Sequence, residues 1–323
     1  MAYWQKTTET LWYNEQSFYC AGEYGARGSK RAKRRKATPA EIERANQRNR
    51  EKRVQELIAC NFDEGDIWLT LKHPVGERPG TVQEFDGEIS EFVARVRYQY
   101  QKRGEKFKWI FREEVGVRGG MHAHFVCNRI PDSNRIISDA WTRARGKTPI
   151  EDMLVDGFCP FDGMSHFEDI RRLGNGEQLA EYLCKELPPK EKYSESVELS
   201  DDDRKRLSRY RCSRGLKKPV VKKKKYSHWT MKRILDLGVE GINTPAGDKF
   251  RTPGYIVDKD TWVTGVCQYT GLTYLHYIEI PTRRGRWETE KKRQRKQMDA
   301  DCTVAVRTAG TMKAGSAGSR RKN

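Results

Sequence analysis

The sequence lacks the features of membrane-spanning and secreted proteins. No apolar run approaches the ~18 residues that a transmembrane helix needs. The first residues, Met1 to Tyr19, are polar and aromatic and lack the apolar core of a signal peptide. We therefore expect no membrane partner, and a protein that stays in the compartment where it is made.

The sequence also lacks the signatures of metal clusters and of nucleotide-driven motors. None of its eight cysteines forms a Cys-x-x-Cys pair, which argues against a zinc cluster and a dense disulfide framework. There is no Gly-x-x-x-x-Gly-Lys-Ser/Thr loop, so we expect neither an ATPase nor a helicase activity. We expect reduced thiols and no small-molecule cofactor.

What the sequence has in excess is positive charge. The 63 Lys and Arg residues against 45 Asp and Glu residues give a formal net charge of +18. Such an excess is typical of proteins that bind a polyanion, most commonly nucleic acid. A solvated arm that only aids solubility is the alternative for the basic runs. The candidate DNA-binding residues lie in two runs: Lys30, Arg31, Lys33, Arg34 and Arg35, then Lys222, Lys223, Lys224 and Lys225.

Shifts in composition divide the chain into four parts. Residues 1–60 form a basic, aromatic N-terminal arm, irregular up to residue 26, with a helix from about Pro39 to Ala59 that Thr38 and Glu41 cap. Residues 61–190 are the main folded domain. Residues 191–282 are a C-terminal accessory region with a β-rich patch over 255–280. Residues 283–323 read as a basic disordered tail.

The spacing of apolar residues in the main domain predicts an α+β fold. Alternation of period two predicts strands, and spacing of three to four predicts helices. The expected order is strand, helix, strand, strand, helix, strand, helix, over 67–71, 81–101, 107–115, 121–129, 132–145, 165–171 and 176–187. This order favours a ferredoxin-like, or RRM-like, antiparallel sheet with helices on one face.

Two histidines on one predicted strand are the first candidates for chemistry. Because side chains alternate along a strand, His122 and His124 point to the same face. They can share a divalent cation if a neighbouring strand adds a carboxylate, and the hairpin offers Glu113 or Glu114. Imidazole and carboxylate ligands with open positions suit Mg²⁺ or Mn²⁺. Taken alone, His-x-His on a strand is more typical of two surface or hydrogen-bonded histidines.

A tyrosine and a lysine on a later predicted helix are the second candidates. Positions i and i+3 of a helix are neighbours, so Tyr182 and Lys185 share a face. A free phenol has a pKa near 10, and a nearby cation favours the phenolate that a nucleophile requires. Taken alone, the pair is more typical of a tyrosine packed on the sheet beside a solvated lysine.

The order of these motifs resembles that of the HUH endonucleases of rolling-circle replication, in particular the single-tyrosine replication initiators of small phages and plasmids. Trp68 to Leu71 corresponds to the family's first motif, His122-Ala123-His124 to the second, and Tyr182-Leu183-Cys184-Lys185 to the third. The resemblance covers about Asp66 to Leu187. The family's Glu-x-Gly pattern points to Glu114 as the third ligand, whereas strand pairing could equally present Glu113.

The resemblance implies a replication enzyme that nicks and rejoins single-stranded DNA at an origin. Tyr182 would attack the scissile phosphate with help from Lys185, and Glu114, His122 and His124 would hold the metal. The implied partners are an origin strand and the host helicase and polymerase, in the cytoplasm of a bacterial host cell. Two rivals remain: an HUH transposase or relaxase, and a non-enzymatic RRM-like protein that binds nucleic acid.

Overall fold

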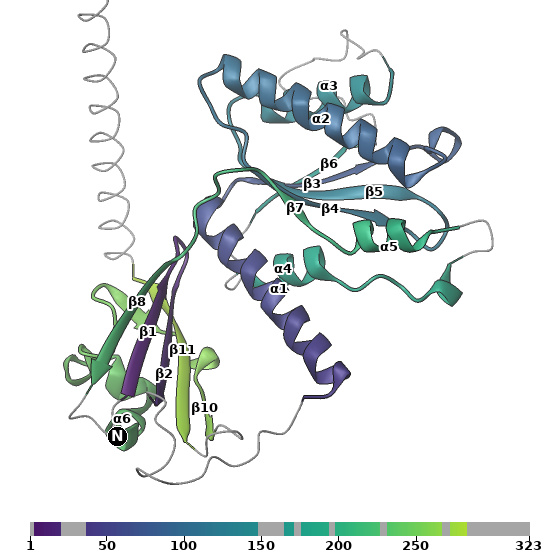
Figure 1. Ribbon diagram of the computed structural model, residues 1–323. Coiled ribbons are helices and arrows are strands. Elements are labelled where there is room, and N and C mark those ends of the chain that lie inside the picture. Colours follow the sequence, from purple (N-terminus) through teal and green to yellow (C-terminus); the bar gives the residue numbers. More distant parts are fainter. Residues whose placement is uncertain are drawn as a thin grey trace, which may run out of the picture. The chain divides into compact units, whose positions relative to one another are not determined.

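The computed structural model describes residues 3–20, 37–147, 165–170, 176–193, 198–226, 231–266 and 272–282. The chain forms two compact units (Figure 1). Residues 9–12 and 32–220 make one, called here the central unit. Residues 1–8, 13–31 and 221–323 make the other, called here the terminal unit. The four-part division expected from composition stays a prediction.

The central unit is built on a five-stranded antiparallel sheet. Its strands are β3 (Ile67–Lys72), β4 (Trp109–Val115), β5 (Met121–Cys127), β6 (Ser165–Asp169) and β7 (Arg211–Cys212). They lie in the order β6-β3-β5-β4-β7, and all their pairings are antiparallel. Without β7, this is the strand order of a ferredoxin-like fold. The predicted α+β class is confirmed.

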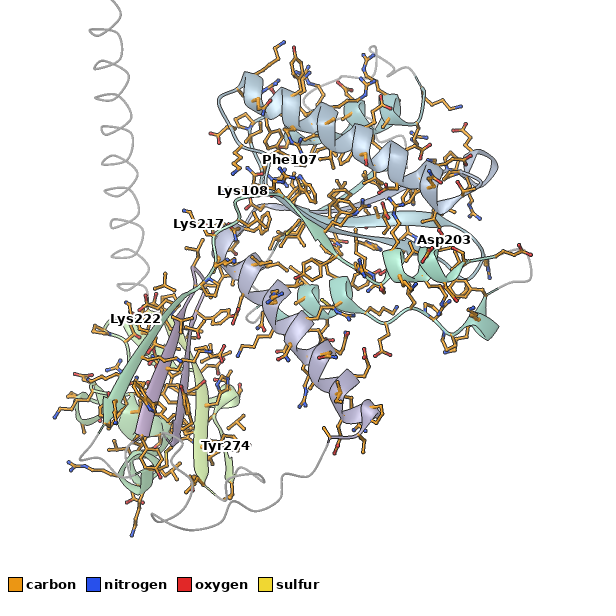
Figure 2. The ribbon with its side chains drawn as sticks, in the orientation of Figure 1. Phe107, Lys108, Asp203, Lys217, Lys222 and Tyr274 are labelled. Carbon is orange, nitrogen blue, oxygen red and sulfur yellow. The ribbon has the colours of Figure 1, made fainter. Side chains whose placement is uncertain are left out.

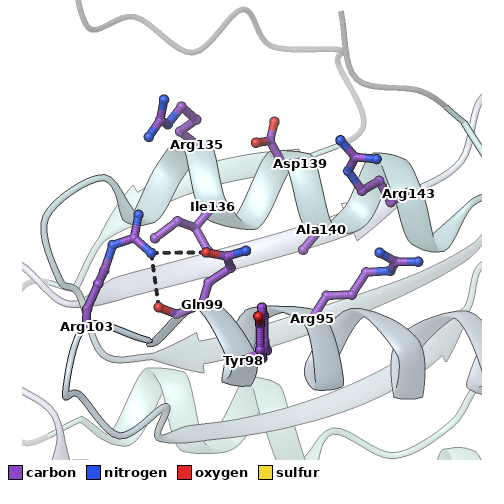
Figure 3. Close-up of a pocket in the computed structure, with 9 residues that line it drawn as sticks. All are labelled: Arg95, Tyr98, Gln99, Arg103, Arg135, Ile136, Asp139, Ala140 and Arg143. Carbon is purple, nitrogen blue, oxygen red and sulfur yellow. Dashed lines mark hydrogen bonds between the residues drawn. The ribbon is translucent and has the colours of Figure 1, made fainter. Parts of the chain in front are cut away.

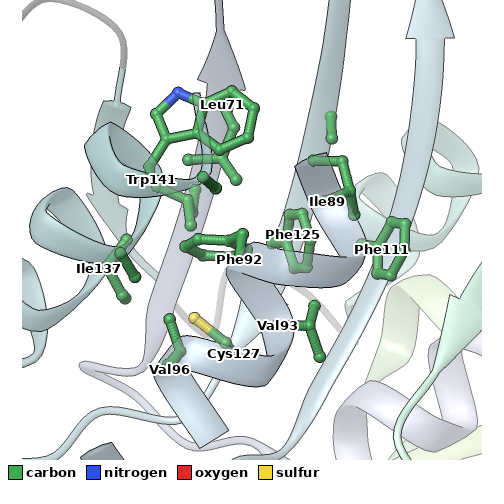
Figure 4. Packing of buried hydrophobic residues seen from close by; sticks show 14 of the residues in the cluster. Leu71, Ile89, Phe92, Val93, Val96, Phe111, Phe125, Cys127, Ile137 and Trp141 are labelled. Carbon is green, nitrogen blue, oxygen red and sulfur yellow. The ribbon is translucent and has the colours of Figure 1, made fainter. Parts of the chain in front are cut away.

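Helices α2 (Val82–Lys102) and α3 (Ser133–Ala144) cover one face of this sheet (Figure 1). Phe92 on α2 makes edge-to-face contacts with Phe125 on β5 and Trp141 on α3 (Figure 4). All three side chains are fully buried. Burial of each such aromatic side chain contributes about 1.5–3 kcal/mol. This side of the sheet is therefore the main hydrophobic core.

Helices α1 (Pro39–Asn61) and α4 (Glu177–Cys184) lie on the opposite side of the sheet (Figure 1). The capping box predicted for α1 is present, because Thr38 and Glu41 bond each other's backbone N–H groups. The prediction for α4 was wrong at its end: the helix stops at Cys184 instead of residue 187, and Lys185 is its C-cap. Two carbonyls at that end are taken by other elements: Gln47 Nε2 of α1 donates to Cys184 O (2.6 Å), and Arg112 of β4 donates to Lys185 O.

The terminal unit contains a second sheet that joins the two ends of the chain. Its strands are β1 (Tyr3–Glu9), β2 (Asn14–Cys20), β8 (Val220–Tyr226), β9 (Tyr255–Val257), β10 (Val263–Val266) and β11 (Thr273–Pro281). The order is β10-β11-β2-β1-β8, with β9 paired to β11. Helix α6 (Met231–Ile242) belongs to the same unit, whereas α5 (Asp201–Leu207) belongs to the central unit.

The terminal sheet corrects one expectation and confirms another. The first 26 residues are not irregular throughout, because β1 and β2 form within them and β2 pairs with β11. The β-rich patch expected over 255–280 is present as β9, β10 and β11. The expected basic tail over 283–323 lies outside the described residues. Within the described part of the chain, no helix has both the length and the apolar character needed to cross a membrane.

Candidate metal and tyrosine site

Strand register places the predicted metal ligands on the sheet face away from α2 and α3. Glu114 on β4 pairs with His122 on β5, and Arg112 pairs with His124. On the other side of β5, Thr70 of β3 pairs with His124. Glu113 alternates to the core-side face, where Arg211 Nη2 donates to its carboxylate. The register thus places Glu114, and not Glu113, beside the imidazoles.

Glu114, His122 and His124 form a cluster with the composition of a metal site. One potential ligand atom from each residue lies within 4.8 Å of the other two. His122 Nδ1 lies 3.2 Å from Gly120 O, so this nitrogen carries the proton and Nε2, which lies 3.5 Å from Glu114 Oε2, offers a lone pair. Among the described residues, buried Glu114 Oε1 has no hydrogen-bond donor. Two imidazoles and a carboxylate with unused lone pairs suit a divalent cation.

His124 is held by three different side chains. Its Nδ1 lies 3.0 Å from Thr70 Oγ1, and its Nε2 lies 3.1 Å from the Tyr182 hydroxyl. The indole of Trp68 stacks on the ring, with centroids 5.5 Å apart and planes 11° apart. Because Thr70 occupies Nδ1, Nε2 is the nitrogen that remains for a metal. The phenol oxygen of Tyr182 therefore stands next to the candidate ligand atom.

Tyr182 reaches this position from α4, which lies over the site side of the sheet. Its ring meets the edge of the His124 ring at 4.7 Å and that of Trp68 at 5.5 Å, centroid to centroid. The side chain is still 39% exposed, so a ligand can approach the phenol from solvent. A tyrosine that served only as core would be covered. This arrangement fits a nucleophile or a group that contacts a ligand.

Arg112 fixes the end of α4 against the sheet. Its side chain is 1% exposed and donates to the carbonyls of Lys185, Leu183 and Leu207. Its Nε also lies 3.9 Å from Glu114 Oε1. Charge-assisted bonds to helix carbonyls satisfy acceptors that would otherwise be orphaned. One buried guanidinium thereby links the tyrosine helix to the strand that carries Glu114.

The electrostatics of the site favour neutral histidine and neutral phenol when no metal is bound. Burial, together with the neighbouring His122 imidazole, lowers the pKa of His124 to about 4. Burial and the Glu114 carboxylate raise the pKa of the Tyr182 phenol. For Glu114, burial alone would raise the pKa, but His122, His124 and Arg112 together hold it below the usual range. His124 is thus ready to bind a metal at neutral pH, whereas Tyr182 needs a further cation to ionise.

Lys185 and the basic runs have different outcomes. Lys185 Nζ lies 6.0 Å from the centre of the Tyr182 ring, although it caps the helix and does not continue it. Lys222 to Lys225 lie exposed on β8, an edge strand of the terminal sheet (Figure 2 labels Lys222). The predicted DNA-binding residues Lys30, Arg31, Lys33, Arg34 and Arg35 lie outside the described residues.

The motifs alone assign no role to Trp68, Thr70 or Arg112, which the structure brings into the site. All three carry the signal of strand alternation. Trp68 and Thr70 are two apart on β3, and Arg112 and Glu114 are two apart on β4. Once the register is known, each lies on the face that carries His122 and His124.

Comparison with known proteins agrees with this placement. The model of a family described as replication-associated protein ORF2 matches residues 66–190. That segment contains all of β3 to β6 and α4, including Glu114, His122, His124 and Tyr182. Neither the curated proteins nor the solved structures yielded a match. The similarity associates this segment with replication.

Proposed function

We propose that the chain is a metal-dependent endonuclease that nicks and rejoins single-stranded DNA at an origin to start rolling-circle replication. The observation that carries the proposal is the contact between the Tyr182 hydroxyl and His124 Nε2 at 3.1 Å, beside the Glu114 and His122 ligand atoms. Residues from three separate strands and a helix supply a nucleophile and a metal site at one place. The family match over 66–190 supports a role in replication.

Glu114 with His122 and His124 would hold Mg²⁺ or Mn²⁺, through one carboxylate oxygen and the Nε2 atoms. When bound, the cation supplies Lewis-acid polarisation of a scissile phosphate and favours the phenolate form of Tyr182. The residues present fit that role, because an acceptor oxygen of Glu114 is unpaired among the described residues and His124 is neutral at physiological pH.

In the proposed reaction, Tyr182 Oη attacks the phosphorus of the scissile phosphodiester. The bond from phosphorus to the 3′ oxygen breaks as the bond to Oη forms. The phenolic proton leaves to water at the exposed edge of the ring, and the departing 3′ oxygen gains a proton. The products are a 5′-phosphotyrosine and a free 3′-hydroxyl. Because one phosphodiester replaces another, the reverse reaction rejoins the strand without ATP.

The remaining side chains orient Tyr182 and the imidazoles. Thr70 and Trp68 fix the His124 ring by a hydrogen bond and a stacking contact. Arg112 holds the end of α4, so that Tyr182 stays over His124. Lys185 carries a positive charge at the exposed side of the phenol. These contacts lower the reorganisation needed before attack.

The sharpest test is capture of a covalent protein–DNA adduct. The protein is incubated with labelled single-stranded DNA and Mn²⁺, denatured, and digested for mass spectrometry. We expect a phosphate-linked oligonucleotide on Tyr182. The Tyr182→Phe variant should give no adduct, with filter binding of DNA within a few-fold of wild type. Wild-type adduct yield from Tyr182→Phe would refute the assignment.

The rivals predict other results in the same system. A transposase or relaxase would also form the adduct, but would transfer element ends or transfer-origin strands in preference to replication-origin hairpins. A non-enzymatic RRM-like module would bind without an adduct. Phe125 argues against that module, since an aromatic ring on a central strand reads bases only when exposed. Here Phe125 is fully buried against Phe92 and Phe111.

We also propose a single-stranded origin as the DNA partner and host helicase and polymerase as the partners that extend the free 3′ end. Since a nicked duplex must be unwound before it is copied, an enzyme that only cleaves and joins depends on them. A reconstitution of nicked supercoiled DNA with purified host helicase and polymerase checks this. Strand synthesis should require wild-type protein and stop with Tyr182→Phe.

A further inference from the structure

A second cluster of cations lies in the central unit, away from the three ligands. A pocket of about 390 Å³ opens between α1 and the segment that joins α5 to β7. It is lined by Asn46, Asn49, Arg50, Arg53, Arg209 and Tyr210. Its walls therefore present three guanidiniums, two amides and an aromatic ring, and none of the lining residues is acidic. The function proposed above leaves this cluster without a role.

Helical spacing explains how α1 builds one wall of this pocket. Asn46, Asn49, Arg50 and Arg53 follow the i, i+3, i+4, i+7 pattern and therefore share one stripe of the helix. Val54 and Ile58 of the same helix are fully buried. The polar stripe is thus held in place by an apolar face that packs into the central unit. The opposite wall is Arg209 and Tyr210, which follow directly after α5.

The guanidiniums in this pocket have no carboxylate partner within the described chain. Arg50 Nη1 donates to the neutral amide oxygen of Gln47 at 3.1 Å, and no ion pair involves Arg50, Arg53 or Arg209 among the described residues. Elsewhere the same chain neutralises its arginines. Arg211, two residues beyond Arg209, bonds both Asp86 and Glu113. Convergent unpaired cations are unfavourable unless an anion binds between them.

The pocket adjoins the end of the helix that carries the tyrosine. Gln47, on the turn of α1 that contains Asn46 and Arg50, donates to Cys184 O at the last residue of α4. Arg50 also acts electrostatically on the Cys184 thiol and on the Arg112 guanidinium. The pocket and Tyr182 are therefore joined through α4 within one compact unit. A polyanion bound at Tyr182 can extend to the pocket without leaving that unit.

We propose that this pocket binds a nucleotide of the single strand whose scissile phosphate reacts at Tyr182. Arg50, Arg53 and Arg209 would pair with its phosphodiester oxygens, Tyr210 would stack on its base, and the amides of Asn46 and Asn49 would meet the base edge. Guanidinium forks match phosphate geometry, and base stacking on an aromatic ring tolerates any base. This inference rests on the proposed function, because it concerns the same DNA strand.

Binding of oligothymidylates to the Tyr182→Phe protein tests the proposal without cleavage. The test variant adds Arg53→Ala and Arg209→Ala. The control adds Arg103→Ala and Arg143→Ala, which removes the same charge from another basic pocket, between α2 and α3 (Figure 3). That pocket lies on the core-side helices, on the opposite side of the sheet from the tyrosine site. All four arginines are exposed, so neither pair of substitutions disturbs a buried contact.

We expect the test variant to bind an oligomer of about 16 nucleotides at least tenfold more weakly than the control. An oligomer of about 4 nucleotides, too short to occupy both places, should show no such difference. The slope of log affinity against log salt should fall by about 1.4, because each lost phosphate contact releases ~0.7 fewer counterions from a single strand. Equal affinities and slopes for the test and control proteins would overturn the proposal.

Photocrosslinking provides a readout that charge alone does not move. An oligonucleotide that contains 5-iodouracil should crosslink to Tyr210, and Tyr210→Phe should retain the affinity that Tyr210→Leu loses. Crosslinks that all lie outside the pocket would overturn the assignment. The adduct assay separates the two claims. An adduct with equal binding of test and control sinks the pocket alone, whereas selective loss of binding without any wild-type adduct sinks the nuclease and leaves a single-strand binding site.

Discussion

Two adjacent glutamates on β4 give the sharpest check of the metal site. Glu114 lies on the face of the histidines, with its Oε2 3.5 Å from His122 Nε2. Glu113, one residue earlier, lies on the other face and is 3% exposed, bonded to Arg211 and 3.8 Å from Arg206 Nε. Since the two residues have the same chemistry and differ only in strand face, the substitutions Glu114→Gln and Glu113→Gln should have opposite effects.

Glu114→Gln should weaken Mn²⁺ binding by a factor of about 100 to 1,000. Two unit charges 4 Å apart at an effective dielectric constant of 20 interact by about 4 kcal/mol, and desolvation of the carboxylate offsets part of that gain. Glu113→Gln should leave Mn²⁺ affinity within a few-fold. It should instead lower the free energy of unfolding by about 1–2 kcal/mol. That is below the 3–5 kcal/mol of a fully buried pair, because Arg206 and Arg211 are each 36% exposed and keep Asp86 as a partner.

Isothermal titration with Mn²⁺ and urea unfolding of the chelator-treated proteins measure the two effects separately. Wild-type protein and both variants are compared at pH 7. The variant Glu113→Gln serves as the matched control for charge and volume. The register argument is wrong if Glu113→Gln loses as much Mn²⁺ affinity as Glu114→Gln, or if Glu114→Gln binds Mn²⁺ like wild type.

Three further predictions follow from the same contacts. Tyr182→Phe should keep Mn²⁺ affinity within a few-fold while adduct formation disappears, so a large loss in a Mn²⁺ titration would make Tyr182 a ligand instead of a nucleophile. Arg112→Met should lower the free energy of unfolding by about 3 kcal/mol, about 1 kcal/mol for each of three lost hydrogen bonds. It should also speed hydrogen exchange in α4 more than in α2, and equal acceleration in both helices would contradict a local role. In metal-free protein, stability should fall as the pH falls from 6.5 to about 4, because His124 has a folded pKa of about 4 and the unfolded chain protonates first. At 1.36 kcal/mol per tenfold change in proton affinity the loss is about 3 kcal/mol, and urea unfolding of wild type and His124→Asn at each pH should show it only in wild type.

The central sheet could be predicted because each of its strands carries a local signal. Leu69 and Leu71 alternate with polar neighbours on β3, and Phe85, Ile89 and Phe92 repeat at helical spacing on α2. These side chains are buried by elements that follow within a short stretch of chain. Local periodicity and tertiary burial therefore agree, and the predicted order of elements is confirmed.

Strands β1 and β2 could not be predicted because their burial is polar. Gln5 Nε2 bonds Gln16 Oε1 at 3.0 Å, and Gln16 Nε2 bonds Glu279 Oε2 at 3.1 Å, all in the interior of the terminal unit. A buried hydrogen-bonded network leaves no apolar alternation in the sequence. Moreover, β2 pairs with β11, which is more than 250 residues away along the chain. No local window contains that partner.

The site itself was only half determined by sequence. Alternation alone puts His122 and His124 on one face, but the choice between Glu113 and Glu114 depends on the register of β4 with β5. A shift of one residue exchanges the two faces. The end of α4 depends on contacts from Gln47 and Arg112, which belong to other elements. Pro188 and Pro189 signal only that the helix has ended before them.

The alternation that defines the site also explains why its imidazoles can be held in place without a metal. Ala123 and Phe125 alternate with the two histidines along β5 and are fully buried on the core side. Phe125 stacks on Phe111 with centroids 4.4 Å apart, and Phe111 immediately precedes Arg112 on β4. Each side chain that packs the core therefore fixes the backbone of a neighbour that faces the site. The positions of His122, His124 and Arg112 are in this way set by the packing under α2 and α3, which a DNA strand on the other face does not have to disturb.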